Sequence, residues 1–100
     1  MTTDVTKLTK AGDLVYWCEG CGHAHIVPAE RWHWNGDREK PTLDPSVRHF
    51  YTHPETKKEI TVCHYMLQGG VLKYCGDCQH QYKGMHRPLV PIPAHYSVPE

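Results

Sequence analysis

The sequence predicts a mainly β fold: a small antiparallel β domain of zinc-ribbon type with little or no helix. Short runs of β-branched and aromatic residues recur along the chain and are separated by glycine and proline signals. Two Cys-x-x-Cys motifs each follow such a run. No segment keeps an apolar period of 3.6 residues, apart from one turn expected at residues 28–31.

The size of the chain limits the hydrophobic core that it can build. Its 100 residues, 39% of them hydrophobic, make one domain with a modest core. Small domains of this kind gain stability from metals, disulfides or partners. We expect a flexible polar N-terminus at residues 1–12, a zinc-stabilised β domain at 13–91 and a proline-rich extended tail at 92–100.

The cysteines are expected to be reduced. The N-terminus carries no apolar signal region, and no stretch approaches the roughly 20 apolar residues that span a bilayer. We therefore expect a cytoplasmic protein with no membrane partner, whose cysteines are ligands or reactive groups. Their odd number, five, also disfavours a closed disulfide framework.

The first half of the chain predicts three short strands. Residues 14–17 lead into the first cysteine motif, and residues 25–27 return from it until Pro28 ends the run. Residues 31–34 alternate, which places both of their tryptophans on one face. The Asn-Gly-Asp sequence at 35–37 is typical of a turn.

The second half predicts an extended loop and three further strands. Residues 40–46 contain two prolines and are expected to form a loop, because a central strand excludes proline. Residues 47–51 and 59–66 have β-type composition and are joined by a loop of hairpin length. A Gln-Gly-Gly turn at 68–70 leads into a strand at 71–75.

The two cysteine motifs predict one structural zinc site. Cys18 and Cys21 lie in a tight turn after a strand, and so do Cys75 and Cys78, so each turn can direct two thiolates at one ion. Redox chemistry is less favoured, since no helix follows either motif to lower a thiol pKa. Ordinary free or buried cysteines are the remaining alternative.

The fifth cysteine leaves the ligand set open. The Gln-Gly-Gly turn brings Cys63 opposite Cys75, or within one residue of it. Three thiols therefore gather near the second motif, and spacing alone favours Cys75 with Cys78 as ligands. His64 and His80 lie beside this cluster as spare ligands or as site residues.

The order of the motifs resembles a family of small, mostly phage-encoded Cys-x-x-Cys proteins, some of which carry the label ammonia monooxygenase. The resemblance spans about residues 16–91 and rests on the combined order of several short pieces. Those pieces are Trp17-Cys18 with Cys21, Trp34-Asn35-Gly36, Pro41-Thr42 with Pro45-Ser46, Cys63-His64, Asp77-Cys78, His80 and Gly84.

This resemblance has two implications. It implies Cys18, Cys21, Cys63 and Cys78 (or His80) as ligands, in contrast to the choice that spacing favours. It also implies a phage or prophage setting, and hence the cytoplasm of a bacterial host. It transfers no known reaction.

A catalytic function would use the polar residues around the second motif. His64 or His80 would act as a general base oriented by Asp77, with Ser46 or a metal-bound water as the nucleophile, in a hydrolase that works beside the metal site. Against this, the available thiolates favour a closed structural ion. The hydroxyls of Thr42 and Ser46 could equally bond to the backbone of a rigid loop.

The sequence favours a binding module over an enzyme. Aromatic side chains that remain exposed would suit an interface; the candidates are Tyr16, Trp32, Trp34, Phe50, Tyr65 and Tyr74. Eleven basic residues balance eleven acidic ones, which favours a host or phage protein over nucleic acid as the partner. In a phage setting, such a module would act as an inhibitor of a host defence system such as CRISPR.

Overall fold

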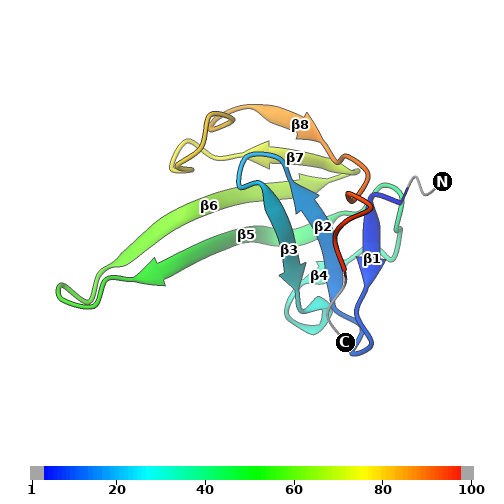
Figure 1. The fold of residues 1–100 in the computed structure, drawn as a ribbon, viewed down its shortest axis with the longest axis horizontal. Helices are drawn as coiled ribbons and strands as arrows, with labels where there is room; N and C mark the ends of the chain where they lie inside the picture. The colour runs from blue at the N-terminus through cyan, green and yellow to red at the C-terminus, as the bar shows by residue number, and fades with distance from the viewer. Residues whose placement is uncertain (1–3, 98–100) are drawn as a thin grey trace.

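The computed structural model describes residues 4–97 and contains two antiparallel β-sheets (Figure 1). The three-stranded sheet has the order β1-β2-β3, and the five-stranded sheet has the order β4-β5-β6-β7-β8. The strands are β1 Thr6–Leu8, β2 Leu14–Cys18, β3 His23–Val27, β4 His33–Trp34, β5 Leu43–Thr52, β6 Glu59–Gln68, β7 Val71–Tyr74 and β8 His86–Pro88.

The predicted fold class is confirmed: the protein is mainly β and antiparallel. Within residues 4–97 the helical content is one 3₁₀ turn, η1 Ala29–Arg31, which lies where the sequence predicted a turn. No helix in this part of the chain is long and apolar enough to cross a membrane. The zinc-ribbon type remains a prediction with which this architecture is compatible.

The three-stranded sheet is built on the hairpin of the first cysteine motif. β2 pairs with β3 so that Tyr16 lies opposite His25 and Cys18 lies opposite His23. Side chains of alternate residues point to the same face of a strand. Tyr16, Cys18 and His25 are all buried, and they form the inner face of this sheet.

The N-terminal segment is more ordered than its polar composition predicted. Residues 6–8 form β1, which pairs antiparallel with β2, and Thr6 is buried. The Thr6 hydroxyl donates a hydrogen bond to the carbonyl oxygen of Arg38 at 2.6 Å. Strand pairing satisfies the polar backbone here, so the segment expected to be flexible joins the sheet. Residues 1–3 of that segment lie outside the described residues.

The five-stranded sheet contains a long hairpin that projects from the body of the molecule (Figure 1). β5 and β6 each have 10 residues, and their far halves extend beyond the other strands. The tip of this arm, residues 53–58, is the loop predicted between the two strands.

The expected extended loop at residues 40–46 is in part a strand. β5 already begins at Leu43, and β4 pairs with it through Trp34 opposite Leu43. Proline is tolerated because the register between β5 and β6 is irregular between Leu43 and Val47. Pro45 lies within this irregularity, where it blocks no ladder hydrogen bond.

The register of β6 and β7 decides which way the second cysteine motif faces. Tyr65 lies opposite Tyr74, and the Cys75 N–H donates to the His64 carbonyl at 2.8 Å. Cys75 is therefore the neighbour of His64, not of Cys63. Since a shift of one residue moves a side chain to the other face, Cys75 and Cys63 lie on opposite faces of the sheet.

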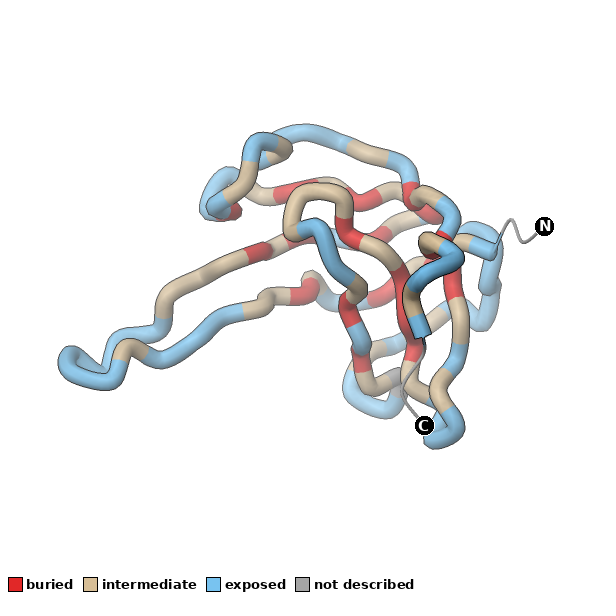
Figure 2. The backbone as a smooth tube through the Cα atoms, in the orientation of Figure 1, coloured by how far each residue is buried: buried red, intermediate tan, exposed pale blue. Residues whose placement is uncertain are grey.

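The two sheets bury a common core (Figure 2). Tyr16 from the three-stranded sheet meets Tyr65 from the five-stranded sheet, and their hydroxyls are hydrogen-bonded. The C-terminal segment packs on the same two sheets. β8 pairs with β7, and buried Ile92 donates its N–H to the Asp4 carbonyl at 3.0 Å. Residues 98–100 of the predicted extended tail lie outside the described residues.

A candidate catalytic triad beside a thiol centre

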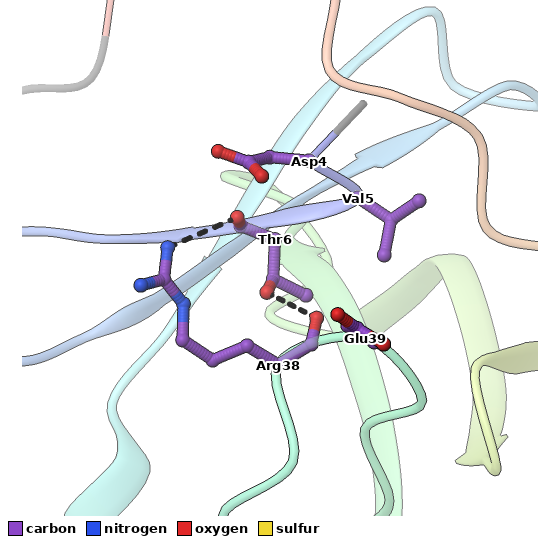
Figure 3. Close-up of a pocket in the computed structure, with 5 residues that line it drawn as sticks. All are labelled: Asp4, Val5, Thr6, Arg38 and Glu39. Carbon is purple, nitrogen blue, oxygen red and sulfur yellow. Dashed lines mark hydrogen bonds between the residues drawn. The ribbon is translucent and has the colours of Figure 1, made fainter. Parts of the chain in front are cut away.

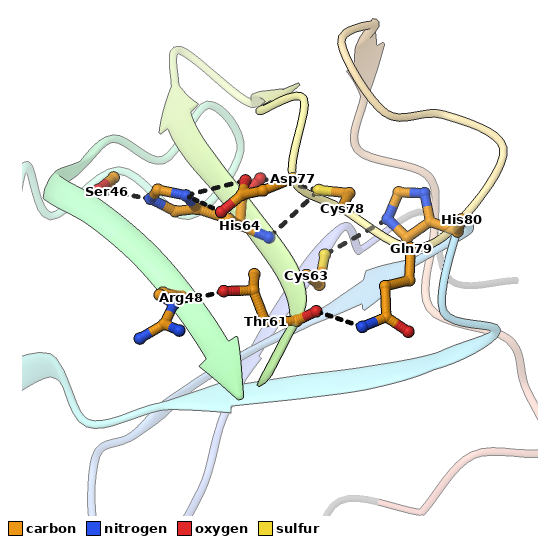
Figure 4. A network of polar contacts seen from close by, with 9 residues as sticks. All are labelled: Ser46, Arg48, Thr61, Cys63, His64, Asp77, Cys78, Gln79 and His80. Carbon is orange, nitrogen blue, oxygen red and sulfur yellow. Dashed lines mark hydrogen bonds and ion pairs between the residues drawn. The ribbon is translucent and has the colours of Figure 1, made fainter. Parts of the chain in front are cut away.

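His64 lies between a serine and an aspartate on the outer face of the five-stranded sheet (Figure 4). Its Nε2 atom is 3.1 Å from the Ser46 Oγ, and its Nδ1 atom is 3.2 Å from each carboxylate oxygen of Asp77. The side chains of His64 and Asp77 are 26% and 49% exposed, so the group is open to solvent. These are the contacts of a Ser-His-Asp triad, which is recognised by geometry and not by chain order.

The hydrogen bonds select one tautomer of the neutral imidazole. A carboxylate only accepts hydrogen bonds, so the His64 Nδ1 carries the proton that it donates to Asp77. The Nε2 of the neutral ring is then the acceptor of the Ser46 hydroxyl. In this tautomer the Nε2 atom of His64 can accept the proton of the Ser46 hydroxyl, which is the geometry that a general base requires.

The irregular start of β5 presents Ser46. Bulges re-aim side chains and occur often beside active sites. The Ser46 carbonyl accepts a hydrogen bond from the Trp32 indole Nε1 at 3.2 Å, which anchors the backbone of the bulge. Its hydroxyl remains available for His64.

The second cysteine motif presents Asp77. The Cys78 N–H donates to the Cys75 carbonyl at 3.3 Å, which closes a tight turn with Asp77 inside it. Cys78 then fixes this turn to β6, because its Sγ accepts from the His64 N–H at 3.2 Å and donates to the His64 carbonyl at 3.0 Å. One thiol thus joins the segments that carry Asp77 and His64.

A thiol centre lies on the opposite, inner face of the same sheet. Ligand atoms of four side chains lie within 4.8 Å of one another: Cys18, Cys21, His25 and Cys63. Cys63 and Cys78 also form a group with His80. The centre directly adjoins the triad in sequence, since its member Cys63 precedes His64.

The thiols of this centre share negative charge. Hydrogen bonds from Cys21 and Cys63 lower the pKa of Cys18 well below the ordinary thiol value. The same bonds raise the pKa of Cys21 to about 12 and raise the pKa of Cys63 as well. The arrangement therefore favours a thiolate at Cys18, the charge state in which a cysteine binds metal.

Neighbouring groups support the Cys18 and Cys63 sulfurs. The Tyr74 hydroxyl contacts the Cys18 Sγ at 3.1 Å, and the His80 Nε2 contacts the Cys63 Sγ at 3.4 Å. The His80 Nδ1 accepts the Tyr82 N–H at 3.2 Å, so its Nε2 is the donor. Such outer contacts orient metal ligands and are typical of metal centres.

The residues present fit a tetrahedral metal ion. Three sulfurs and one imidazole are a donor set that structural zinc sites use. The His25 Nε2 is buried and has no hydrogen-bond partner within residues 4–97, which is costly unless a ligand occupies it. Cys78, in contrast, already uses its Sγ on the His64 backbone. The geometry thus favours His25 as the fourth ligand.

Burial also keeps the neighbouring His49 neutral. The His49 ring stacks on the His25 ring with centroids 3.8 Å apart, and desolvation lowers the pKa of His49 to about 4. Its Nε2 is 2.9 Å from the Tyr65 hydroxyl. A neutral His49 ring places no positive charge beside His25 and the thiol centre.

The structure distributes the residues predicted from the sequence over two places. Ser46, His64 and Asp77 meet on the outer face, while Cys18, Cys21 and Cys63 meet on the inner face with Cys78 and His80 nearby. Cys75, which spacing paired with Cys78, lies instead in a group with His64 and Asp77. Burial and the charge of Asp77 raise the pKa of the Cys75 thiol.

Thr42 does not join the triad. Its hydroxyl accepts the Gly69 N–H at 2.9 Å, which is the backbone-bonding role that the rigid-loop alternative expected. Ser46 differs, because its hydroxyl meets His64. The prolines of this loop do not indicate which of the two hydroxyls meets His64. The position of each hydroxyl relative to β6 decides this.

His25 is a candidate ligand that the sequence did not predict. It lies four residues after Cys21. Its side chain reaches the thiol centre because the register of β2 and β3 places it opposite Tyr16. The signal was available in part, since alternate residues of the returning strand, His25 and Val27, face the core. A histidine at an inward position next to a cysteine motif is a ligand candidate.

The aromatic residues differ in how much of each side chain is exposed to solvent. Tyr16 and Tyr65 are fully buried, Trp32 and Trp34 pack partly against the core, and Phe50 and Tyr51 are 48% and 49% exposed. The exposed aromatic surface therefore lies on the arm and not at the tryptophans.

Some cavities of the described part of the chain lie away from the triad. One of about 520 Å³ is formed at the N-terminal strand by Asp4, Val5, Thr6, Arg38 and Glu39, none of them a predicted site residue (Figure 3). Another, of about 210 Å³, adjoins the first cysteine motif and includes His80 but not His64; its lining is Gly20, Cys21, His23, Val62, Gln79 and His80. The two histidines thus do not share this pocket.

The chain is similar to a known protein family. A family model described as "Bacterial ubiquitination-like system serine protease (BubE)" matches residues 2–75 of the chain. No curated protein and no solved structure matches it significantly.

Proposed function

Since the chain belongs to the family of bacterial ubiquitination-like system serine proteases (BubE), we propose that it is a serine protease whose nucleophile is Ser46. One observation carries this assignment. The chain has two serines, Ser46 and Ser97, and only Ser46 lies within the matched residues. That serine is also the one whose hydroxyl meets a histidine oriented by an aspartate.

The reaction follows from the hydrogen bonds of His64. The Ser46 Oγ attacks the scissile carbonyl carbon while the His64 Nε2 takes the hydroxyl proton, and that proton then passes to the leaving amine. Asp77 holds the imidazole in the required tautomer and stabilises its protonated form. Water cleaves the resulting acyl-enzyme ester by the same route, with His64 as the base.

The substrate is proposed to be a peptide or isopeptide bond in a protein of the ubiquitination-like system. Between Val47 and Thr52, β5 pairs with β6 on one edge, and the described residues supply no backbone partner for its other edge. An extended chain can add to such an edge as a further strand. A substrate segment bound there would run past Ser46 at the start of that edge.

We assign the thiol centre to a structural zinc ion held by Cys18, Cys21, His25 and Cys63. Three thiolates and one imidazole that can surround a single ion favour zinc, which prefers four ligands in a tetrahedral arrangement. The ion supplies stability and no chemistry, since all four positions are filled by protein. By fixing Cys63, it also fixes the backbone position of His64 on β6.

Half-exposed Phe50 and Tyr51 support a second candidate function. They suit a protein interface, and they are the feature that favours the binding module that the sequence suggested, including an inhibitor of a host defence system. Under that alternative, Ser46 would have no activated hydroxyl. The two functions are therefore separated by the reactivity of Ser46.

The deciding experiment is covalent labelling with a fluorophosphonate, which reacts with activated serines. We expect one adduct on the intact protein, mapped to Ser46 by peptide mass spectrometry. Ser46→Ala should abolish it, whereas Ser97→Ala is the matched control and should label at the wild-type rate. Asp77→Asn should slow hydrolysis of a p-nitrophenyl ester by roughly 10³-fold to 10⁴-fold, because it disturbs the tautomer of His64.

A folded protein that takes no label at Ser46 would refute the protease assignment. It would leave the binding module as the better account of the exposed aromatic residues. Circular dichroism of each variant establishes that the fold is retained.

A further inference from the structure

A third group of metal-binding side chains lies on the outer face of the sheet. His64, Cys75 and Asp77 each offer one ligand atom, and these atoms lie within 4.8 Å of one another. This group is separate from the thiol centre on the inner face. It contains two members of the triad and one cysteine that the triad does not use.

The backbone, and not a chance choice of rotamers, brings these three residues together. The Cys75 N–H bonds to the His64 carbonyl at 2.8 Å, which makes the two residues cross-strand neighbours. Side chains of such neighbours on one face are about 5 Å apart at Cβ. The tight turn after Cys75 then returns Asp77 to the Nδ1 of His64.

The group is accessible to ions in solution. The side chains of His64 and Asp77 are 26% and 49% exposed, and Cys75 is partly exposed. No described residue closes it off from solvent in the way that the two sheets enclose the thiol centre. An ion can therefore enter and leave without unfolding the protein.

The chemistry of the three donors selects the ion. An imidazole, a thiol and a carboxylate are ligands of zinc sites that retain one open position. Mg²⁺ and Ca²⁺ prefer oxygen donors and would gain little from the sulfur or the imidazole. The group therefore discriminates for Zn²⁺ over Mg²⁺ and Ca²⁺.

We propose that His64, Cys75 and Asp77 form an inhibitory Zn²⁺ site, through which zinc reversibly switches off the protease. This inference rests on the proposed function, because inhibition requires the Ser46–His64–Asp77 triad to be catalytic. Zinc bound to His64 and Asp77 removes the contact that orients the imidazole, so His64 no longer accepts the proton of Ser46. Cys75 is the specificity-determining ligand, because it binds zinc and has no part in the triad.

The test uses the full chain with metal retained in the thiol centre. Ser46 labelling by the fluorophosphonate is measured against free Zn²⁺ in a zinc-buffered solution. We expect inhibition in the micromolar range, and we expect Cys75→Ser to raise the zinc concentration required by at least about tenfold. Millimolar Mg²⁺ is the control and should leave labelling unchanged.

A second measurement does not depend on catalysis. Zn²⁺ should slow the alkylation of Cys75 by iodoacetamide in the Ser46→Ala protein, as quantified by peptide mass spectrometry, and Asp77→Asn should weaken this protection. Protection of Cys75 without any labelling of Ser46 would support the metal site while refuting the protease. Unchanged alkylation, or equal zinc sensitivity of the wild type and Cys75→Ser, would overturn the inhibitory site.

Discussion

At the scale of single residues, Gly20 shows how the two cysteine motifs meet. Gly20 belongs to the first motif, and the imidazole of His80, which follows the second motif, packs directly against it. A Cβ atom at position 20 would overlap the His80 ring. Only glycine leaves room for this contact, through which His80 reaches the Cys63 sulfur.

Gly20→Ala is therefore expected to destabilise the protein. The ring of His80 must move, with loss of its contacts to Cys63 and Tyr82, and overpacking of this kind costs about 1–3 kcal/mol. Thermal denaturation should show a lower Tm. Gly76→Ala is the matched control in the other motif, since a Cβ there would meet nothing within 4 Å. If the two variants have the same Tm, the packing of His80 on Gly20 contributes nothing to stability.

At the scale of elements, the arm of β5 and β6 carries proposed site residues at its base, and we expect its tip to be dispensable. Its base carries Ser46, Cys63 and His64, while residues 54–58 of its tip are exposed. The charged pair of Arg48 and Glu59, 2.9 Å apart, lies on the surface and contributes little to stability. The fold of the site should therefore not depend on the tip.

Replacing residues 52–59 by Asn-Gly tests this division. Tyr51 and Ile60 face each other across the hairpin, so a two-residue turn between them keeps the register. We expect the free energy of unfolding to change by no more than about 1 kcal/mol, and Ser46 to retain its fluorophosphonate label. Loss of the label in a folded protein would mean that the tip helps to hold the triad.

At the scale of the whole molecule, the thiol centre joins segments that are far apart in the sequence. Cys18 and Cys21 come from the first hairpin, and Cys63 comes from the middle of β6. The centre thus holds the three-stranded sheet against the sheet that carries the triad. Under the zinc assignment and the protease function proposed above, stability and catalysis should depend on the same metal ion.

Cys18→Ser is expected to lose the metal and to unfold at ordinary temperature, because structural zinc in small domains is worth roughly 10–16 kcal/mol of apparent binding energy. His25→Ala should also lose zinc. Cys75→Ser is the control, since Cys75 lies outside the thiol centre, and it should retain one zinc per chain. Elemental analysis by mass spectrometry and thermal denaturation measure both properties. A Cys18→Ser protein with full metal content and an unchanged Tm would contradict the assignment.

Much of the fold was predictable from local pattern. The strands at 14–17, 25–27, 47–51, 59–66 and 71–75 were predicted from β-type composition and turn signals, and the structure confirms them within a few residues. The strand expected at 31–34 is shorter, because η1 occupies residues 29–31. Local composition is sufficient here because glycine and proline restrict the backbone wherever the chain turns.

The sequence by itself determined the β class, the two cysteine turns and the pool of chemically capable residues, all of which depend on local composition and spacing. Only the tertiary structure decided which members of that pool meet. One residue of register places Cys75 beside His64 and away from Cys63, and an irregular strand directs Ser46 rather than Thr42 at the imidazole. The face on which a side chain lies is set by pairing between distant strands, and no local pattern contains that pairing.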